Sequence, residues 1–301
     1  TYHFLDKRDL FDLKSLLSLR KFISMNNIEI VHAHGSSWFF AVLCKLIKDN
    51  FKLIWHDHYG NSEYLEARRK FPLNFFSKFF NGIITVNKDL KWWAENNLKC
   101  DNIIVLNNFL VDKDQAETML RIPENVFNIV CVANLRIQKD HFSLLKACDL
   151  VSEEYSIKLH IIGKNFKDKY AQSLNKEFEK REYVTYHGEI LEPFPILKKM
   201  DLGILSSKSE GLPLTILEYG LADLDIICTD VGECSEILEG NGILVNPQDV
   251  KSLSRAIKKI IRGLHDFKKK SKLFKQKIIR NYSSEAVIPI YENFIVNNVK
   301  K

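Results

Sequence analysis

Short apolar runs alternate with longer amphipathic segments along the whole chain. In the first part of the sequence the apolar runs, six or seven residues long and rich in β-branched side chains, lie at 28–34, 52–58, 82–87 and 102–108. The segments between them, such as 37–49 and 88–98, have helical period. This alternation predicts a parallel sheet with crossover helices.

A polar, proline-containing stretch at about 111–125 interrupts the alternation, which then restarts. The later apolar runs lie at 127–134, 156–163, 184–188, 202–207, 225–230 and 242–246. Because near-continuous apolar strands are buried on both faces, we predict an α/β protein with two doubly wound, Rossmann-like domains facing a cleft. The predicted domains span 1–126 and 127–282, and 283–301 is predicted as a last helix, capped at Ser283 or Ser284, that packs back on the first domain.

Composition limits the class of protein. With 301 residues, 46% of them hydrophobic and 27% charged, the chain is long enough for two ordinary domains. The net charge of +6 suits anionic ligands or an anionic membrane surface, but it is too small to argue for a nucleic-acid partner. No apolar run reaches the roughly 18 to 20 residues that cross a bilayer. The six scattered cysteines form no C-x-x-C pair and are expected to be buried thiols in a reducing cytoplasm.

The stretch 206–232 places two glutamates in different settings. Glu210 follows a predicted strand, at the end where open α/β sheets bind ligands, and Pro213 opens a helix. The first amides of that helix, at Leu214 and Thr215, suit a phosphate. Glu218 lies in an apolar segment, where a carboxylate costs free energy unless it has a partner. The spacing of the two glutamates alone favours a solvated loop acid at Glu210 and a chance polar residue on an amphipathic helix at Glu218, and it is the apolar context of Glu218 that changes this.

A second cluster follows the strand at 127–134. Arg136 and Lys139 precede a helix that begins near Lys139 to Phe142, so two cations and a helix N-terminus lie at one strand end. This combination is typical of an anion site, although such a turn is also a common surface charge pair.

A third pattern consists of two His-x-His sequences at strand ends, His32/His34 and His56/His58. Side chains two apart on a strand share a face, so each pair could hold a metal ion, as in hydrolase barrels. A metal-dependent hydrolase is therefore an alternative. Against it, the pairs lie on neighbouring strands of a short α/β half and no ordered run of further ligands follows.

Three common site motifs are missing from the sequence. It contains no G-x-G-x-x-G, no G-x-x-x-x-G-K-[ST] and no G-x-S-x-G. Dinucleotide oxidoreductases, P-loop enzymes and nucleophile-elbow hydrolases are therefore disfavoured.

Five segments together resemble a retaining glycosyltransferase of the GT-B fold, in the large family 4: "SEGLPLTILEYG", "NLRIQKDH", "LHIIGK", "VTYHGEI" and "DVGECSEILEGNGILV". The resemblance covers nearly the whole chain. It implies transfer of a sugar from a nucleoside-diphosphate sugar to an acceptor hydroxyl in cell-surface polysaccharide or glycolipid synthesis. The C-terminal domain of the family holds the donor and the N-terminal domain holds a saccharide or lipid-linked acceptor. A nucleotide-sugar 2-epimerase of the same fold is a further alternative.

The resemblance also implies residue roles. Glu210 would hold hydroxyls of the donor sugar, Glu218 the ribose hydroxyls, and Lys139 the diphosphate. Many relatives place an arginine where Asn134 stands, and Arg136 is the candidate substitute. His56 corresponds best to the family histidine near the reacting face of the sugar, with His58 the second choice. Two loops complete the site. The backbone of the first would bind the sugar and the diphosphate through its amides, except at the proline; it comprises Gly211, Leu212, Pro213, Leu214 and Thr215. The second would contact the base and comprises His187, Gly188, Glu189 and Ile190.

The family mechanism needs no metal and no cofactor beyond the nucleotide-sugar co-substrate. Lys139, Arg136 and a helix N-terminus would stabilise the charge that develops on the leaving diphosphate. Relatives begin with a first strand and a glycine-rich turn that are not visible in this sequence, so we expect a first domain that is incomplete at its start.

The segment 68–82 combines Arg68, Arg69, Lys70 and Lys78 with five phenylalanines. This composition suits peripheral contact with an anionic membrane, such as the inner face of the plasma membrane, and a core-facing helix fits it equally well.

Overall fold

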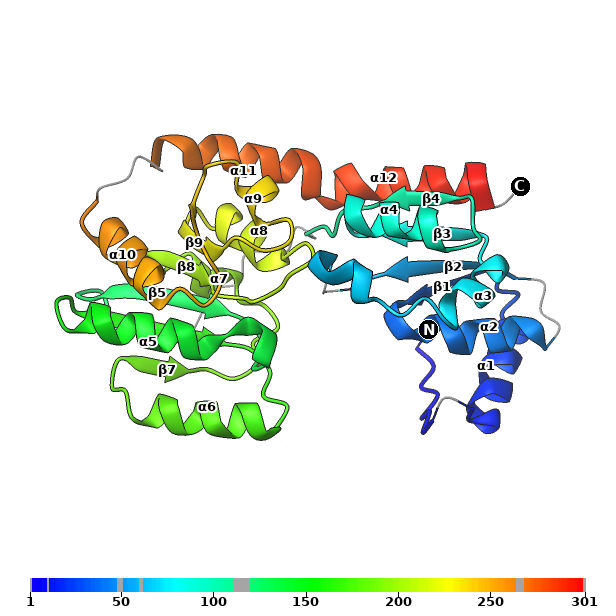
Figure 1. Ribbon diagram of the computed structural model, residues 1–301, viewed down its shortest axis with the longest axis horizontal. Coiled ribbons are helices and arrows are strands. Elements are labelled where there is room, and N and C mark those ends of the chain that lie inside the picture. The colour runs from blue at the N-terminus through cyan, green and yellow to red at the C-terminus, as the bar shows by residue number, and fades with distance from the viewer. Residues whose placement is uncertain are drawn as a thin grey trace. The chain divides into compact units, whose positions relative to one another are not determined.

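The chain forms two compact units, described here from a computed structural model (Figure 1). The first unit comprises Thr1–Asn107 and Val287–Lys301, and the second comprises Asn108–Ala286. The structure describes residues 2–9, 11–47, 51–59, 62–110, 120–263 and 268–299.

The first unit is built on a parallel sheet with the strand order β1-β2-β3-β4. Its strands are β1 (Ile30–His34), β2 (Lys52–Asp57), β3 (Gly82–Thr85) and β4 (Ile103–Val105). Its helices are α1 (Leu13–Met25), α2 (Trp38–Leu46), α3 (Leu73–Phe76), α4 (Lys88–Asn97) and most of α12 (Ser284–Phe294), which continues as a π-helix over Ile295–Val299. Short 3₁₀ turns lie at Gly35–Ser37, Ser62–Ala67 and Ser77–Phe79.

Local sequence explains where these elements begin. The side chain of Asp12 accepts a hydrogen bond from the amide of Ser15 at the start of α1, and Asn87 does the same for Leu90 at the start of α4. The strand β2 is buried on both faces from Leu53 onwards, as expected for a central parallel strand.

The second unit contains a parallel six-stranded sheet with the order β10-β9-β8-β5-β6-β7. Its strands are β5 (Phe127–Val132), β6 (Ile157–Ile162), β7 (Val184–Tyr186), β8 (Leu202–Leu205), β9 (Asp225–Thr229) and β10 (Ile243–Val245). From β5 the chain extends the sheet through β6 and β7 on one side, and then through β8, β9 and β10 on the other. The order therefore reverses between β5 and β8, which is the position where doubly wound sheets bind ligands.

Helices cover both faces of this sheet. One apolar cluster contains Ile129 of β5 and residues of α5 (His141–Ser152), α6 (Lys169–Glu179) and α10 (Val250–Ile261). The other contains Val130, the next residue of β5, and residues of four further helices. These are α7 (Phe194–Leu197), α8 (Leu214–Leu221), α9 (Cys234–Leu238) and α11 (Lys268–Tyr282). Alternate residues of β5 thus enter opposite cores, as the strand period requires.

All ten strands of the described residues occur where the apolar runs predict them, and the α/β class with two parallel sheets is confirmed. The second sheet is doubly wound as predicted, whereas the order β1-β2-β3-β4 of the first runs in one direction. The structure divides the chain at 107/108 rather than at 126/127. Leu110 forms an isolated bridge with Ser283, and Leu120 and Ile122 pack against the core of the second unit. Residues 111–119 of the predicted connecting stretch lie outside the described residues. Ser283 caps α12, since its hydroxyl accepts a hydrogen bond from the amide of Ala286.

All six cysteines are buried, and no disulfide joins them. Burial raises the pKa of Cys131 to about 12, so this thiol stays protonated. The cysteines are therefore core residues, as the sequence predicts.

Candidate active site

Lys139 and Glu210 meet at the point where the strand order of the second unit reverses. Lys139 ends the 3₁₀ turn Ile137–Lys139 that follows β5, and Glu210 lies in the loop after β8. The Lys139 Nζ is 2.5 Å from the Glu210 Oε1. The hydroxyl of Ser207 donates to the same oxygen, also at 2.5 Å. A buried carboxylate that accepts two such hydrogen bonds is held in one orientation.

Backbone hydrogen bonds join the two loops that carry this pair. The amide of Lys208 donates to the carbonyl of Gln138 at 2.7 Å, and the hydroxyl of Ser206 donates to the carbonyl of Lys139 at 3.0 Å. Asp140 adopts a left-handed conformation with φ of 46° and starts α5 directly after the lysine. The backbone of Lys139 is therefore held in place by the contacts of Gln138 before it and by the conformation of Asp140 after it.

A third loop, which follows β9, closes on Glu210 from another side. A Cβ at Gly232 would lie 2.3 Å from the carbonyl oxygen of Glu210, and the φ of Gly232 is +53°. Only glycine satisfies both conditions. The amide of Glu233 donates to the carbonyl of Gly211 at 3.1 Å, which ties the same two loops together.

The helix α8 begins at the end of the Glu210 loop, with Pro213 as its N-cap. Gly211 and Thr215 are half-buried, Leu212 and Pro213 are buried, and Leu214 is exposed. The first amides of any helix have no acceptor within the helix, so those of Leu214 and Thr215 can bind an anion. Glu218 is half-buried one turn beyond Leu214.

Tyr219 anchors α8 to the sheet. Its fully buried hydroxyl accepts a hydrogen bond from the amide of Val132 at 2.8 Å, and the carbonyls of Ile204 and Val130 lie 3.3 and 3.4 Å away. The side chain of Thr215 donates to the carbonyl of Val132 at 3.2 Å. The helix is thus attached to β5 at the strand end where Lys139 follows.

Arg136 has a different environment from Lys139. It is exposed, and its guanidinium lies over the ring of Phe166, 4.4 Å from the centroid. Asn134, at the position where many relatives have the arginine, accepts a hydrogen bond from the amide of Lys164 at 2.8 Å. The structure therefore brings Lys139 and Glu210 together and gives Arg136 a separate aromatic support.

The segment predicted to contact the base follows β7. His187 shares a hydrogen bond of 2.9 Å with His160, whose other nitrogen is 3.1 Å from the Asn128 side chain. Gly188 has a φ of +77°, Glu189 is exposed with its carboxylate 3.6 Å from the ammonium of Lys164, and Ile190 is half-buried. This segment lies at the same edge of the sheet as Lys139 and Glu210, two strands from β5.

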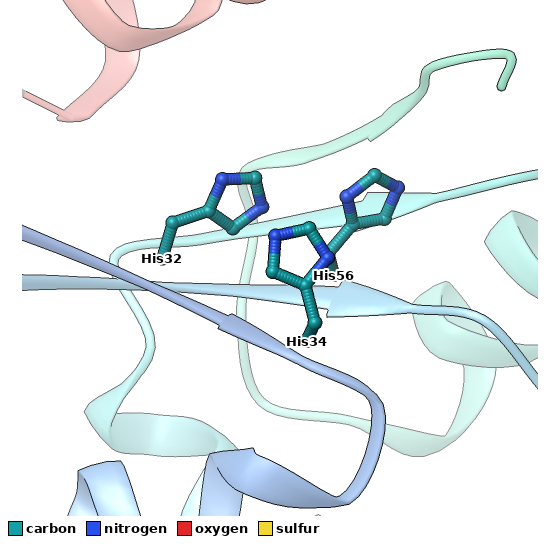
Figure 2. Close-up of side chains that lie close together, drawn as sticks. All are labelled: His32, His34 and His56. Carbon is teal, nitrogen blue, oxygen red and sulfur yellow. The ribbon is translucent and has the colours of Figure 1, made fainter. Parts of the chain in front are cut away.

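The first unit carries a cluster of histidines at its own strand ends. The rings of His32 and His34 of β1 and His56 of β2 lie close together on the same side of the two strands (Figure 2). Ring centroids are 4.3 Å apart for His32 and His34, 5.3 Å for His32 and His56, and 5.1 Å for His34 and His56. The Nδ1 of His34 is 2.9 Å from the Nε2 of His58, and the hydroxyl of Tyr291 in α12 is 3.2 Å from the Nδ1 of His32.

These imidazoles are neutral near pH 7. Burial, followed by the charges of the neighbouring histidines, lowers the pKa of His32 to about 4 and that of His56 to about 2. The nearest carboxylate along the chain, Asp57, forms a bidentate ion pair with Arg68 at 2.6 and 3.0 Å. That guanidinium also lies 4.1 Å from the ring centroid of Trp93. Asp57 is thus neutralised by Arg68.

Comparison with known proteins identifies the family. The model of the glycosyl transferases group 1 matches residues 126–263, and the model of glycosyltransferase family 4 matches residues 1–113. Both halves of the chain therefore carry the same assignment. The chain belongs to the group 1, family 4 glycosyltransferases. This assignment favours neither the metal-dependent hydrolase nor the nucleotide-sugar 2-epimerase considered as alternatives.

Individual relatives agree with this assignment. The transferase is 28% identical over 283 residues to the O-antigen biosynthesis glycosyltransferase WbnH of Escherichia coli, covering 91% of this chain and 80% of that protein. The structure of Anabaena HepE in complex with UDP and glucose is similar with a TM-score of 0.79 at 14% identity, covering 97% of this chain and 84% of that one. A glycosyltransferase from Rickettsia africae gives a TM-score of 0.75 at 18% identity, covering 98% and 84%. These structures show the GT-B fold.

Three residues that contribute to these sites are not predicted from the sequence. They are Ser207, which donates to Glu210, Gly232, which allows the close approach to its carbonyl, and Tyr291, which contacts His32. Ser207 and Gly232 lie in or beside the motifs of the family resemblance, so these two residues could have been identified from the sequence. Tyr291 is 259 residues from His32 and has no such signal.

Proposed function

We propose that this transferase moves a sugar, with retention of configuration, from a nucleoside-diphosphate sugar bound at the carboxyl ends of β5 and β8. The Lys139–Glu210 pair at the reversal of strand order is the observation that carries the proposal. It provides one cation for a diphosphate and one carboxylate for sugar hydroxyls at the usual ligand position of a doubly wound sheet.

The chemical step breaks the bond between the anomeric carbon and the β-phosphate oxygen and forms a bond to the acceptor oxygen on the same face. The acceptor hydroxyl gives its proton to a donor phosphate oxygen, so the products are a glycoside and a nucleoside diphosphate. Negative charge develops on the β-phosphate, and stabilising that charge lowers the barrier. Lys139, Arg136 and the amides at the start of α8 provide fixed positive potential, and the proposal requires no metal ion at the diphosphate.

Within this proposal Lys139 exchanges partners. In the structure its ammonium contacts Glu210, and a bound diphosphate offers it a second anion. Glu210 remains held by Ser207 and then accepts hydrogen bonds from the hydroxyls of the sugar. The pair therefore positions both groups before the donor binds, which limits reorganisation during the reaction.

The remaining roles follow the family resemblance. Glu218 binds the ribose hydroxyls, the segment from His187 to Ile190 contacts the base, and His56 acts at the reacting face of the sugar. The mutual hydrogen bond of His187 and His160 supports the second role, because it fixes the start of this segment.

The acceptor is proposed to be a saccharide or a lipid-linked saccharide of a cell-surface polysaccharide. The name of WbnH, an O-antigen biosynthesis glycosyltransferase, supports this class. A pocket of about 550 Å³ in the first unit offers a binding place for it, lined by residues that include Trp38, Trp55, Tyr59 and Arg69. Aromatic rings with charged groups beside them suit a sugar, whose faces are apolar and whose edges are polar.

Contact with an anionic membrane is part of the same proposal. Among the described residues no helix is long and apolar enough to cross a bilayer. Phe71 and Phe75 are exposed beside the cations Arg69, Lys70 and Lys78, whereas Phe80 is buried in the core. A surface of this kind suits weak peripheral binding to anionic lipid. Flotation with liposomes of anionic and of neutral lipid tests it, and equal absence of binding in both would remove the membrane from the proposal.

The donor is tested by a thermal-shift screen of UDP-, GDP- and ADP-sugars. A ligand that binds the folded state raises its stability by about 2.7 kcal/mol at a concentration 100 times its Kd, so the true donor stands out from the others. The matched variants are Lys139→Ala, which should lose the shift, and Lys180→Ala, which removes an exposed ion pair with Glu177 and should keep it. An equal shift in both variants would contradict the proposed diphosphate site.

A further inference from the structure

The histidine cluster of the first unit has ligand atoms that the sugar-transfer proposal does not use. One nitrogen from each of His32, His34 and His56 lies within 4.8 Å of the other two. The Nε2 of His32 and both ring nitrogens of His56 are buried and have no hydrogen-bond partner within the part of the chain that the structure describes. Buried polar atoms are almost always paired, so three such atoms in one cluster require an explanation.

The existing hydrogen bonds decide which nitrogens face inward. Tyr291 contacts the Nδ1 of His32, and this leaves the Nε2 of His32 for the interior of the cluster. His58 contacts the Nδ1 of His34, which leaves the Nε2 of His34. Both outer contacts resemble the second layer of hydrogen bonds that fixes the tautomer of a metal-bound imidazole.

We propose that His32, His34 and His56 bind one transition-metal ion of the Zn²⁺, Co²⁺ or Ni²⁺ class. Neutral imidazoles are the ligands that these ions prefer, whereas Mg²⁺ and Ca²⁺ require oxygen ligands. The nearest carboxylate along the chain, that of Asp57, is bound by the guanidinium of Arg68, so it does not serve as an oxygen ligand for a hard cation. Zn–N bonds of about 2.0–2.1 Å in a tetrahedral site place the ligand nitrogens about 3.4 Å apart. The three nitrogens lie within 4.8 Å of one another, so binding requires the side chains to rotate and bring them closer by up to about 1.4 Å.

The backbone supports this convergence. His34 is directly opposite His56 in the parallel pairing of β1 and β2, and His32 is two residues before His34 on the same face. All three ligands therefore come from two hydrogen-bonded strands rather than from loops. Sites built on such elements hold their geometry better than sites built on loops.

A metal ion in this cluster affects sugar transfer, a consequence that rests on the proposed role of His56. A metal ion bound to His56 removes a nitrogen lone pair from any contact with the reacting sugar. Zn²⁺ should therefore inhibit transfer, and a chelator should restore it. The metal is a regulator in this view and not a participant in the reaction.

The test uses the full chain without a histidine tag, treated with chelator and titrated with Co²⁺ alone. We expect one equivalent to bind, with visible absorption of the tetrahedral type, and Zn²⁺ to displace it. His34→Gln and His32→Ala should each weaken Co²⁺ binding at least about tenfold, and Tyr291→Phe should weaken it about tenfold. The matched control is His3→Ala, an exposed histidine that contacts Ser18 and Phe22 outside the cluster.

The outcomes separate the two proposals. Absence of binding, or equal Co²⁺ affinity in wild type and His34→Gln, overturns the metal site. Because His34 is exposed, its replacement should leave the fold intact, and circular dichroism checks this. Stoichiometric binding without inhibition of transfer would instead retain the site and overturn the role of His56.

Discussion

Both units place polar side chains at the ends of parallel strands. In the second unit these side chains are charged and paired, whereas in the first unit they are neutral. In the second unit Glu210 is buried and paired with both Lys139 and Ser207. In the first unit the rings of His32 and His56 are neutral, and three of their nitrogens have no hydrogen-bond partner among the residues described. The ends of parallel strands thus carry an ion pair in one unit and, in the other, imidazole nitrogens whose lone pairs can still bind a ligand. The first kind suits an anionic, hydroxyl-rich ligand, and the second suits a soft cation.

The difference extends to the surrounding ion pairs. Asp57 lies beside His56 in sequence, yet its carboxylate is bound to the buried guanidinium of Arg68. Glu210, in contrast, is paired directly with Lys139. The first unit therefore has no carboxylate available to hold a protonated imidazole at this place among the described residues.

The largest effect is expected when the matched pair of the second unit is broken. Lys139→Ala or Glu210→Ala should lower the rate of sugar transfer by about 10²–10³, the usual loss when one preorganised electrostatic group is removed. Initial rates with the donor from the thermal-shift screen measure the effect. Lys180→Ala, which breaks the exposed pair with Glu177, should stay close to the wild-type rate. Comparable rates in all three variants would show that the matched pair is structural only.

The ion pair of the first unit should matter most for stability. Arg68→Met leaves the carboxylate of Asp57 buried without its cation, which costs about 3–5 kcal/mol. The control is Arg181→Met, which breaks more exposed ion pairs with Asp149 and Glu177 and should cost at most about 2 kcal/mol. Urea denaturation of the three proteins measures both values. Equal losses would mean that Asp57 is not isolated from solvent.

The close contact between Gly232 and the carbonyl of Glu210 can be tested by a substitution whose expected effect on stability is smaller and more local. Gly232→Ala adds a clash with the carbonyl of Glu210 to the strain of a left-handed residue, for a total of about 2–5 kcal/mol. Gly240→Ala has the same kind of φ, +79°, with no atom within 4 Å of the new Cβ, so it should cost only about 1–2 kcal/mol. Thermal melts compare the variants. If the two melt alike, the loop after β9 does not constrain Glu210.

The smallest effect tests the anchoring of α8. Tyr219→Phe leaves the buried amide of Val132 without its acceptor, which should cost about 1–3 kcal/mol. Tyr155→Phe removes a hydroxyl that accepts from exposed Arg262 and should change stability by less than about 0.5 kcal/mol. Chemical denaturation is again the measurement. A Tyr219→Phe protein as stable as wild type would show that water replaces the lost hydroxyl.

The elements of this fold are predictable because each strand is a short apolar run with a clear boundary. The strand order is not, since the reversal between β5 and β8 depends on which strands pair after the chain folds. Residue types at Lys139 and Glu210 indicate an anion and sugar site, but their direct contact joins positions 71 residues apart. The face shared by His32 and His34 follows from the strand period, whereas the alignment of His34 with His56 depends on the register of β1 and β2.

Gly203 in β8 has no side chain because the ring of Tyr219 occupies that space, 2.4 Å from where a Cβ would be. Any larger residue at 203 would have to lift α8 away from the sheet. Since Leu214 and Thr215 begin the same helix, such a change would also move the backbone amides that we propose to bind phosphate, although neither residue contacts position 203. A mutation in the interior of a strand could then weaken nucleotide affinity as well as stability.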